Sequence, residues 1–248
     1  MPIDLHTIVS YLDSHLEIEK CPEKISGLYF GKNKHIDKIC FSVDLTQETI
    51  REAIKLGADL LITHHPIDKM PLTFFTSVEK RVKEIISSNL SVYSCHLPLD
   101  RKYNSIALAE YFGLILKGRF AAFNRYKIGV YGRCDKSRIN EALERLKKDY
   151  PFSKIIYHDF GKKPDLIGIV TGNGLTTSVI SEAEYLGIDT VISGEINYHG
   201  YIAAKESGIN VIFLGHYLSE LFGIKMLKNH IEKEFSVESF LIESREFY

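Results

Sequence analysis

Two neighbouring histidines end a short apolar run and are the first candidates for chemistry in this chain. The apolar run 60–63 passes directly into His64, His65 and Pro66. Such a run is typical of a buried strand, and Pro66 cannot donate to a strand ladder, so we expect the strand to end at the histidines. Neighbouring side chains on a strand point to opposite faces. Both imidazoles can therefore serve one site only if the backbone leaves the strand at Thr63 or His64.

A histidine followed four residues later by a carboxylate occurs twice, as His96 with Asp100 and as His216 with Glu220. Positions four apart share one face of a helix, so His216 and Glu220 can converge at a helix start. Pro98 makes the first copy more loop-like. Each pair offers an imidazole nitrogen and a carboxylate oxygen, and both are metal ligands.

Together with His64 and His65, these pairs supply enough ligands for two metal ions. The mixture suits zinc, iron, manganese, cobalt or nickel, and it does not choose among them. Taken alone, the two adjacent histidines fit a metal site and an ordinary hydrogen-bonded pair equally well. His199 is a candidate for a residue that orients a ligand, and its role and that of His96 stay open. We assign no role to the histidines in polar contexts, which are His6, His15, His35, His158 and His230.

The elements that must position these residues alternate between strands and helices. This order predicts an α/β protein with mixed sheets flanked by helices. We expect strands at 25–30, 39–43, 60–63, 90–95, 127–131, 154–158, 166–170, 190–193, 210–214 and 239–242. We expect helices at 4–16, 47–56, 78–87, 105–112, 137–148, 177–186, 198–205 and 218–234, with Thr46 and Asn104 as N-caps.

The two halves of the sequence resemble each other. Aligning Gly57 with Gly187 also aligns Thr46 with Thr176 and Asp59 with Asp189. In the strand that follows, His96 meets His216. We infer an internal duplication that gives two related α/β domains, 1–124 and 125–248, with the metal site between them.

Composition excludes several classes of protein. The 248 residues are 45% hydrophobic and carry 31 basic and 32 acidic side chains, for a net charge of -1. This balance gives no global drive toward nucleic acid, although Lys80-Arg81 or Lys162-Lys163 could form a local patch. The four cysteines are scattered, which is typical of thiols in a reducing compartment. We see neither a signal peptide nor a membrane-spanning run, and we expect a cytoplasmic protein without membrane contact.

Several motifs resemble the NIF-three-like family, whose members are also called GTP cyclohydrolase I type 2 homologues. The motifs are Asp44-Leu45-Thr46, the segment from Gly57 to Pro66, Gly194-Glu195 with His199, and the segment from Gly215 to Glu220. The resemblance implies a duplicated α/β fold, a dinuclear metal centre and a ring-shaped homohexamer with metal sites facing its interior. It also implies a ligand set in which Glu220 bridges two ions, namely His64, His65, Asp100, His216 and Glu220.

The chain departs from the family pattern in places. It has Leu97-Pro98-Leu99 before Asp100, where members often have Thr-Asn-Leu, and Glu195 stands where aspartate is common. The stretch 117–163 leaves room only for a short insertion between the halves. Two functions remain open: a dinuclear metal hydrolase acting on a nucleotide ring or a phosphoester, and a non-enzymatic metal-bearing oligomer that binds protein or nucleic acid.

Overall fold

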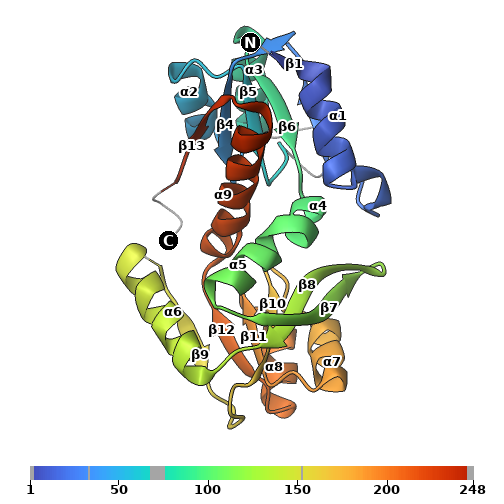
Figure 1. Cartoon of the computed structure of the whole chain (residues 1–248), viewed down its shortest axis with the longest axis vertical. Helices are drawn as coiled ribbons and strands as arrows, with labels where there is room; N and C mark the ends of the chain where they lie inside the picture. The colour runs from blue at the N-terminus through green and yellow to red at the C-terminus, as the bar shows by residue number, and fades with distance from the viewer. Residues whose placement is uncertain (1–2, 33, 68–75, 152, 245–248) are drawn as a thin grey trace. The chain divides into compact units, whose positions relative to one another are not determined.

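The computed structural model describes residues 3–32, 34–67, 76–151 and 153–244 (Figure 1). These residues form two compact units. The first comprises the described residues up to Leu99 together with Ile224–Ser244, and the second comprises Asp100–Gly223. This division differs from the boundary at 124/125 expected from the sequence, because that point lies in the turn of a hairpin inside the second unit. Helix α9 (His216–Phe235) begins in the second unit and ends in the first.

The sheet of the first unit has the strand order β13-β4-β5-β6-β2. Strands β13, β4, β5 and β6 are parallel to one another, and β2 is antiparallel to β6. Its strands are β2 (Gly27–Phe30), β4 (Lys38–Ser42), β5 (Leu60–Thr63), β6 (Ser91–Ser94) and β13 (Glu238–Leu241). A separate antiparallel pair joins β1 (Ile3–Asp4) and β3 (His35–Ile36). All residues of β5 and β6 are buried, as expected for parallel strands covered on both faces.

Helices cover both faces of this sheet. They are α1 (Leu5–His15), α2 (Gln47–Lys55) and α3 (Thr76–Ser87), with the short η1 (Ile18–Lys20) after α1. Cys40, Leu61 and Val92 share a core cluster with Ile50 of α2 and Ile85 of α3. The opposite side of the sheet faces α1, where the Tyr93 hydroxyl donates to Asp13 at 2.8 Å. Alternate side chains of each strand thus enter separate cores.

The sheet of the second unit has the order β7-β8-β10-β11-β12-β9. Its strands are β7 (Ile115–Phe123), β8 (Tyr126–Arg133), β9 (Ile156–His158), β10 (Leu166–Val170), β11 (Thr190–Ser193) and β12 (Asn210–Phe213). Strands β10, β11 and β12 are parallel, so their carboxyl ends meet at one edge. Strand β7 was not expected from the sequence. It pairs with β8 as a long hairpin whose turn is Asn124-Arg125.

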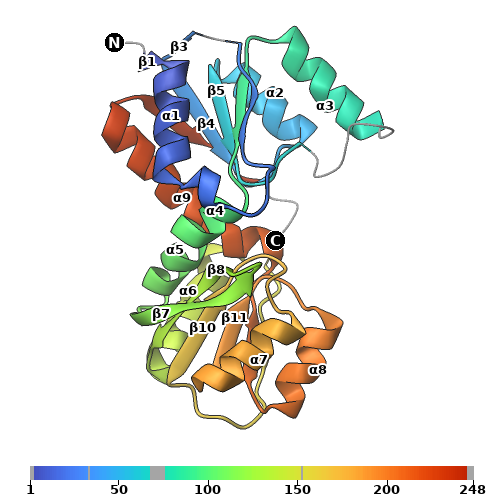
Figure 2. The same cartoon turned by 90° about the vertical axis from the view of Figure 1, so that its right-hand side faces the viewer.

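Figure 2 shows α7 (Thr177–Leu186) and α8 (Tyr198–Glu206) on one face of this sheet and α6 (Lys136–Asp149) on the other. Val191 and Val211 pack in one cluster with Val179 of α7 and Ala204 of α8. Helix α5 (Ser105–Tyr111) contacts β8 and β10. Among the described residues, no helix combines the length and apolar character needed to cross a bilayer.

The repeat predicted from the sequence is visible as shared local structure. Thr46 caps α2 and Thr176 caps α7, each by accepting from the amide three residues on. Asp59 accepts from the amides of Asp37 and Lys38, and Asp189 accepts in the same way from Asp165 and Leu166. The mixed α/β fold with related halves is therefore confirmed.

Two local expectations were wrong, and both concern the candidate ligands. The segment after His96 is helical rather than a loop, with α4 (Leu97–Leu99) followed by η2 (Asp100–Asn104), because proline is tolerated in the first turn of a helix. Asn104 does not cap α5 with its side chain. The side-chain amide of Asn104 instead donates to the Asp100 carboxylate at 2.8 Å.

Candidate metal centre

His64 and His65 follow the end of β5 in the first unit. Their backbone amides still donate to the carbonyls at the end of β4, from His64 to Ser42 at 3.2 Å and from His65 to Val43 at 2.8 Å. The Thr63 hydroxyl donates to the His65 carbonyl at 2.8 Å and so closes a tight turn. The two ring centroids lie 4.6 Å apart, which shows that the backbone leaves the strand where the sequence required it. Both imidazoles can therefore serve one site.

His96 joins this pair from the end of β6. Its ring lies 5.1 Å from the ring of His64 and 5.7 Å from that of His65. One ligand atom from each of the three histidines lies within 4.8 Å of the others. This group, in which His64 and His96 are buried and His65 is partly buried, could hold a metal ion. The alignment of His96 with His216 in the repeat indicated that His96 could belong to the site, although the predicted ligand set left His96 out.

Each imidazole of this group has a defined partner at Nδ1. His64 Nδ1 lies 3.2 Å from the Cys95 carbonyl oxygen. His65 Nδ1 lies 2.7 Å from Asp44, and His96 Nδ1 lies 2.5 Å from Glu23. A hydrogen bond at Nδ1 fixes the tautomer that presents Nε2 as the metal ligand. Asp44 was found by its motif, whereas Glu23 lies in a polar segment that carried no signal.

His216 and Glu220 meet in the first turn of α9, in the second unit. The helix begins at His216 rather than at 218, so the pair lies one helical turn apart, and His216 Nε2 is 3.0 Å from Glu220 Oε1. Glu220 is only 2% exposed. His216 Nδ1 lies 2.6 Å from Glu195, which belongs to the Gly194-Glu195 motif but was not among the predicted ligands.

The two carboxylates around His216 attract positive charge. Burial of the ring works to lower its pKa, but the hydrogen bonds and charges of Glu220 and Glu195 outweigh burial and raise the pKa to about 9. A cation at this position is therefore stabilised by its surroundings. The same arrangement favours a metal ion, which supplies that positive charge.

A tight turn after β10 supports this pair. Gly172 has φ +59°, and a β-carbon there would collide with Glu220 Oε1. Its amide donates to the Ser219 hydroxyl at 2.9 Å, and its carbonyl accepts from the Glu195 amide at 2.9 Å. These contacts explain the tight turn at Gly172 by packing.

Asp100 is held by the same turn. Its Oδ1 accepts from the Thr171 hydroxyl at 2.9 Å and from Asn104 at 2.8 Å, and the side chain is 5% exposed. The turn thus contacts Asp100 through Thr171 and Glu220 through Gly172. Within the second unit, the carboxyl ends of β10, β11 and β12 therefore gather the predicted ligands Asp100, His216 and Glu220. His199 is exposed on α8.

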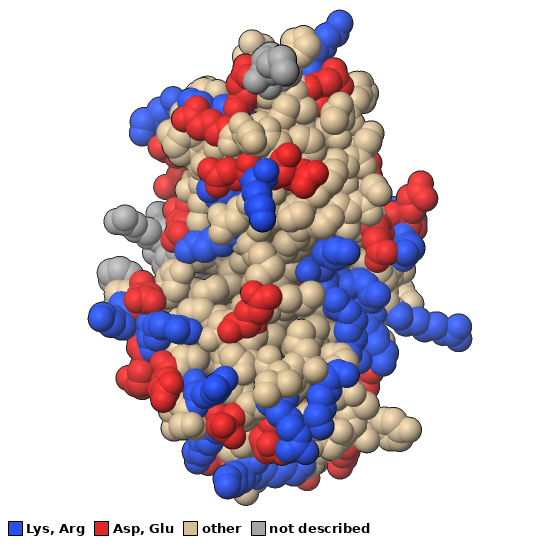
Figure 3. Space-filling model, in the orientation of Figure 1, with Lys and Arg blue, Asp and Glu red and all other residues tan. Residues whose placement is uncertain are grey.

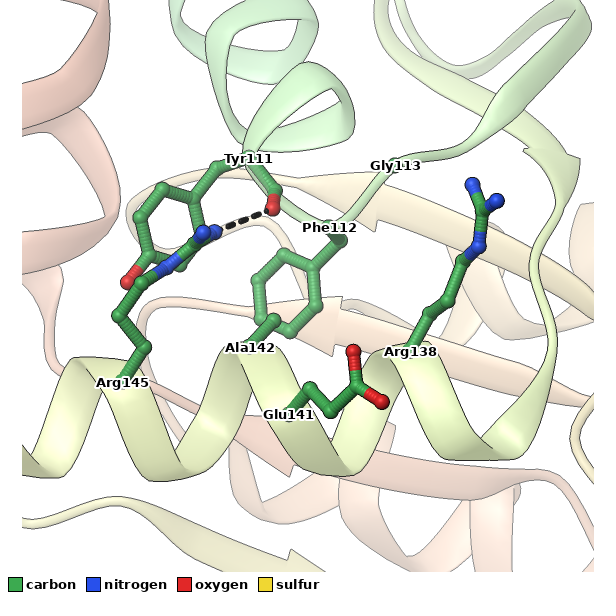
Figure 4. Close-up of a pocket in the computed structure, with 7 residues that line it drawn as sticks. All are labelled: Tyr111, Phe112, Gly113, Arg138, Glu141, Ala142 and Arg145. Carbon is green, nitrogen blue, oxygen red and sulfur yellow. Dashed lines mark hydrogen bonds between the residues drawn. The ribbon is translucent and has the colours of Figure 1, made fainter.

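A separate pocket of about 320 Å³ in the second unit contains none of these residues (Figure 4). It lies between the end of α5 and helix α6. Arg145 stacks on the Tyr111 ring and donates to the Tyr111 carbonyl at 2.9 Å. Glu141 stands between Arg138 and Arg145, so opposite charges alternate along its rim. This pocket therefore has no part in the candidate centre.

The chain is similar in sequence to known proteins. The sequence profile of the Duf34/NIF3 (NGG1p interacting factor 3) family matches residues 3–246. The chain belongs to this family. A "GTP cyclohydrolase 1 type 2 homolog" of Archaeoglobus fulgidus is 29% identical over 97% of this chain and 98% of the relative. One of Deinococcus radiodurans is 31% identical over 93% and 89%.

Solved structures share the fold of this chain. The structure titled "Reduced HcgD from Methanocaldococcus jannaschii" matches with a TM-score of 0.83 at 26% identity, over 98% of this chain and 99% of that one. The protein ybgI, whose function is given as unknown, has a TM-score of 0.86 at 22% identity over 98% of both chains. As a Duf34/NIF3 member, this protein carries buried histidine and carboxylate groups that could hold a metal ion.

Proposed function

We propose that this Duf34/NIF3 protein is a metal-dependent hydrolase that binds two divalent transition-metal ions per chain. The proposed ligands are His64, His65, Asp100, His216 and Glu220, with Glu220 bridging the ions. Zinc, iron, manganese, cobalt and nickel suit these donors. The observation that carries the proposal is the group formed by His64, His65 and a third imidazole, His96, that is not among the proposed ligands. Their ligand atoms lie within 4.8 Å of one another, and their Nδ1 atoms have fixed partners.

Two bound ions would lower the pKa of a water molecule and polarise the bond that it attacks. The protein's own contribution is to orient the donors. Asp44 holds the ring of His65 and Glu195 holds the ring of His216, each through Nδ1. Thr171 and Asn104 fix the carboxylate of Asp100. Burial of His64 and Glu220 keeps bulk water from competing for the donor atoms.

The substrate class is proposed from the relatives. Their name, GTP cyclohydrolase 1 type 2 homolog, supports a nucleotide substrate, attacked either at its ring or at a phosphoester. We also propose that the chain assembles as a homohexamer, which the family resemblance implies. A metal-bearing oligomer without catalytic activity is the alternative if metal binds and nothing is turned over.

Metal loading followed by a substrate screen tests the proposal. We expect elemental analysis to find about two ions per chain after loading with each candidate metal and removal of excess. His64→Ala should lose one ion more than the other, while His199→Ala, which removes an exposed histidine, should retain both. The loaded protein is then incubated with GTP and with p-nitrophenyl phosphoesters. Absence of stoichiometric metal in the wild type would withdraw the site.

A further inference from the structure

His96 lies in the candidate metal centre but is not among the proposed ligands. It follows the end of β6, while His64 and His65 follow the end of β5, the parallel neighbour of β6. All three histidines belong to the first unit, so their arrangement does not depend on the second. His96 is 9% exposed, and a buried polar side chain requires partners. A buried imidazole in this place has either a structural role or a role at the metal.

The spacing of the three rings fits three ligands of one ion. A metal–nitrogen bond of about 2.0–2.1 Å puts the centre of a ligating imidazole about 3.2 Å from the ion, so two imidazoles at a tetrahedral angle have ring centres about 5.2 Å apart. The ring centres of His64 and His65 are 4.6 Å apart, and those of His64 and His96 are 5.1 Å apart. The ring centres of His65 and His96 are 5.7 Å apart. The three distances bracket the tetrahedral value.

A plain hydrogen-bonded pair with Glu23 is the competing explanation for His96. The contact with Glu23, 2.5 Å long, accounts for Nδ1 of the ring. It does not account for the placement of the same ring against the rings of His64 and His65. In metal sites, a carboxylate at one nitrogen of an imidazole leaves the other nitrogen to the ion and raises its basicity. The contact with Glu23 is therefore the one that a metal ligand needs.

The segment 23–26 before β2 holds His96 at two points. Glu23 contacts the ring, and the Ser26 hydroxyl accepts from the backbone amide of His96 at 3.0 Å. Strand β2, which follows this segment, pairs with β6, which precedes His96. Both the backbone and the ring of His96 are thus fixed. A donor that is already oriented loses less conformational entropy when it binds an ion.

The attraction of this group for a cation comes from its donors rather than from surface charge. Figure 3 shows acidic and basic side chains interspersed over the first unit, which is the upper part of that view. Charges of mixed sign give little net attraction for an ion. Imidazole nitrogen suits zinc, iron and nickel, whereas manganese prefers oxygen. A position with three imidazoles therefore favours zinc, iron or nickel over manganese.

We propose that His96 is a further metal ligand, which with His64 and His65 gives one ion a set of three imidazoles, and that Glu23 is the residue that positions it. This inference rests on the proposed function, because it assigns a sixth ligand to one of the two proposed ions. Three histidines are a ligand set of catalytic zinc sites, in which a position stays open for water or substrate.

The first experiment compares the zinc affinities of intact variants by competition with a chromophoric chelator. His96→Gln should weaken binding of one ion at least about 100-fold, because loss of a ligand exceeds the 10- to 100-fold effect of a residue that only orients one. His6→Gln, which changes an exposed histidine of the first unit, should bind both ions as the wild type does. A loss of about tenfold or less in His96→Gln would overturn the ligand role and leave the proposed function standing. Absence of zinc from the wild type would overturn both.

Chemical rescue separates a ligand from a packing residue. His96→Gly removes the whole side chain, so added imidazole can enter the space and bind the ion. Imidazole in solution competes for zinc and should lower the zinc content of the wild type, whereas in His96→Gly it should restore the lost ion. Imidazole that lowered the zinc content of both proteins would overturn the ligand role. If His96→Gly does not fold, as judged by circular dichroism, His96→Ala takes its place.

Glu23 is tested by a double-mutant cycle. Glu23→Gln should weaken binding of the same ion about 10- to 100-fold. In the His96→Gln background it should cause no further loss, because Glu23 acts on the ion through His96. Glu19→Gln, an equal change of charge at an exposed position of the first unit, should have no effect in either background. Equal losses from Glu23→Gln in the two backgrounds would overturn its positioning role.

Discussion

At the residue scale, the candidate ligands share one feature, which is that every imidazole is oriented through its Nδ1 atom. The partners are a backbone carbonyl for His64 and carboxylates for the others. The carboxylates belong to Asp44, Glu23 and Glu195. Such partners fix the tautomer and raise the basicity of Nε2, so they matter to metal affinity although they do not touch a metal.

Asp44→Asn should therefore weaken metal binding. The amide keeps a hydrogen-bonding oxygen near His65 but removes the negative charge that favours Nε2 as a donor. We expect the affinity for one ion to fall about 10- to 100-fold, measured by competition with a chromophoric chelator. Asp37→Asn, an equal change at an exposed aspartate of the first unit, should leave the affinity unchanged. Equal affinities for Asp44→Asn and wild type would show that this contact only packs the ring.

Glu220→Gln should affect both ions together. A carboxylate has two oxygens and can bind one ion with each, whereas the amide offers one good acceptor and no charge. We expect the variant to lose occupancy of both ions and any metal-dependent hydrolysis, as read by elemental analysis and by the substrate screen. Glu232→Gln, on an exposed face of the same helix, is the control. If Glu220→Gln kept both ions at wild-type affinity, the bridging role would be withdrawn.

At the element scale, the strand-end turns position the site. In the second unit, β10, β11 and β12 are parallel, so the residues after each strand meet at one edge, as ligand sites do in open α/β sheets. The turn at Thr171-Gly172 touches both Asp100 and Glu220. The site therefore depends on a glycine that is not itself a ligand.

Gly172→Ala tests this dependence against a matched glycine. Both Gly172 and Gly187 have positive φ, but a β-carbon at Gly187 meets nothing within 4 Å, while one at Gly172 collides with Glu220. Each variant should lose about 1–2 kcal/mol of unfolding free energy from backbone strain. Only Gly172→Ala should also lose metal, as measured by elemental analysis alongside thermal unfolding. Full metal occupancy in Gly172→Ala would show that Glu220 moves aside without consequence.

At the scale of the whole molecule, two related α/β units carry the candidate ligands. The first contributes His64, His65 and His96, and the second contributes Asp100, His216 and Glu220. The duplication explains why each unit carries candidate ligands, because corresponding strands end in polar residues in both halves. Repeating one structural unit thus provides a second set of metal donors without requiring a different fold.

The proposed hexamer is tested in solution. We expect light scattering of the full chain at micromolar concentration to give a mass of about six protomers, and in any case larger than a dimer. The mass of Glu220→Gln should be the same, since a buried ligand does not form a surface contact. Scattering that found only monomer would count against the assembly.

The sequence by itself determined much of this protein. The apolar run before His64, the Thr46 cap and the spacing of His216 to Glu220 are local patterns. They predicted a strand, a helix start and a helical pair that the structure contains. They also predicted the repeat, in which Thr46 and Thr176 each accept from an amide three residues on.

Only the tertiary structure decided which residues hydrogen-bond to the candidate ligands and orient them. Glu23 reaches His96 and Glu195 reaches His216 across separations in sequence for which no local period exists. The hydrogen bonds from Arg101 to the Lys127 carbonyl and from Arg119 to the Arg101 carbonyl likewise require η2 to lie against the β7–β8 hairpin. The sequence pattern did not predict the first strand of that hairpin. Local patterns record backbone preference and burial, whereas these contacts depend on how strands are ordered in a sheet, and that order is set by packing across the whole unit.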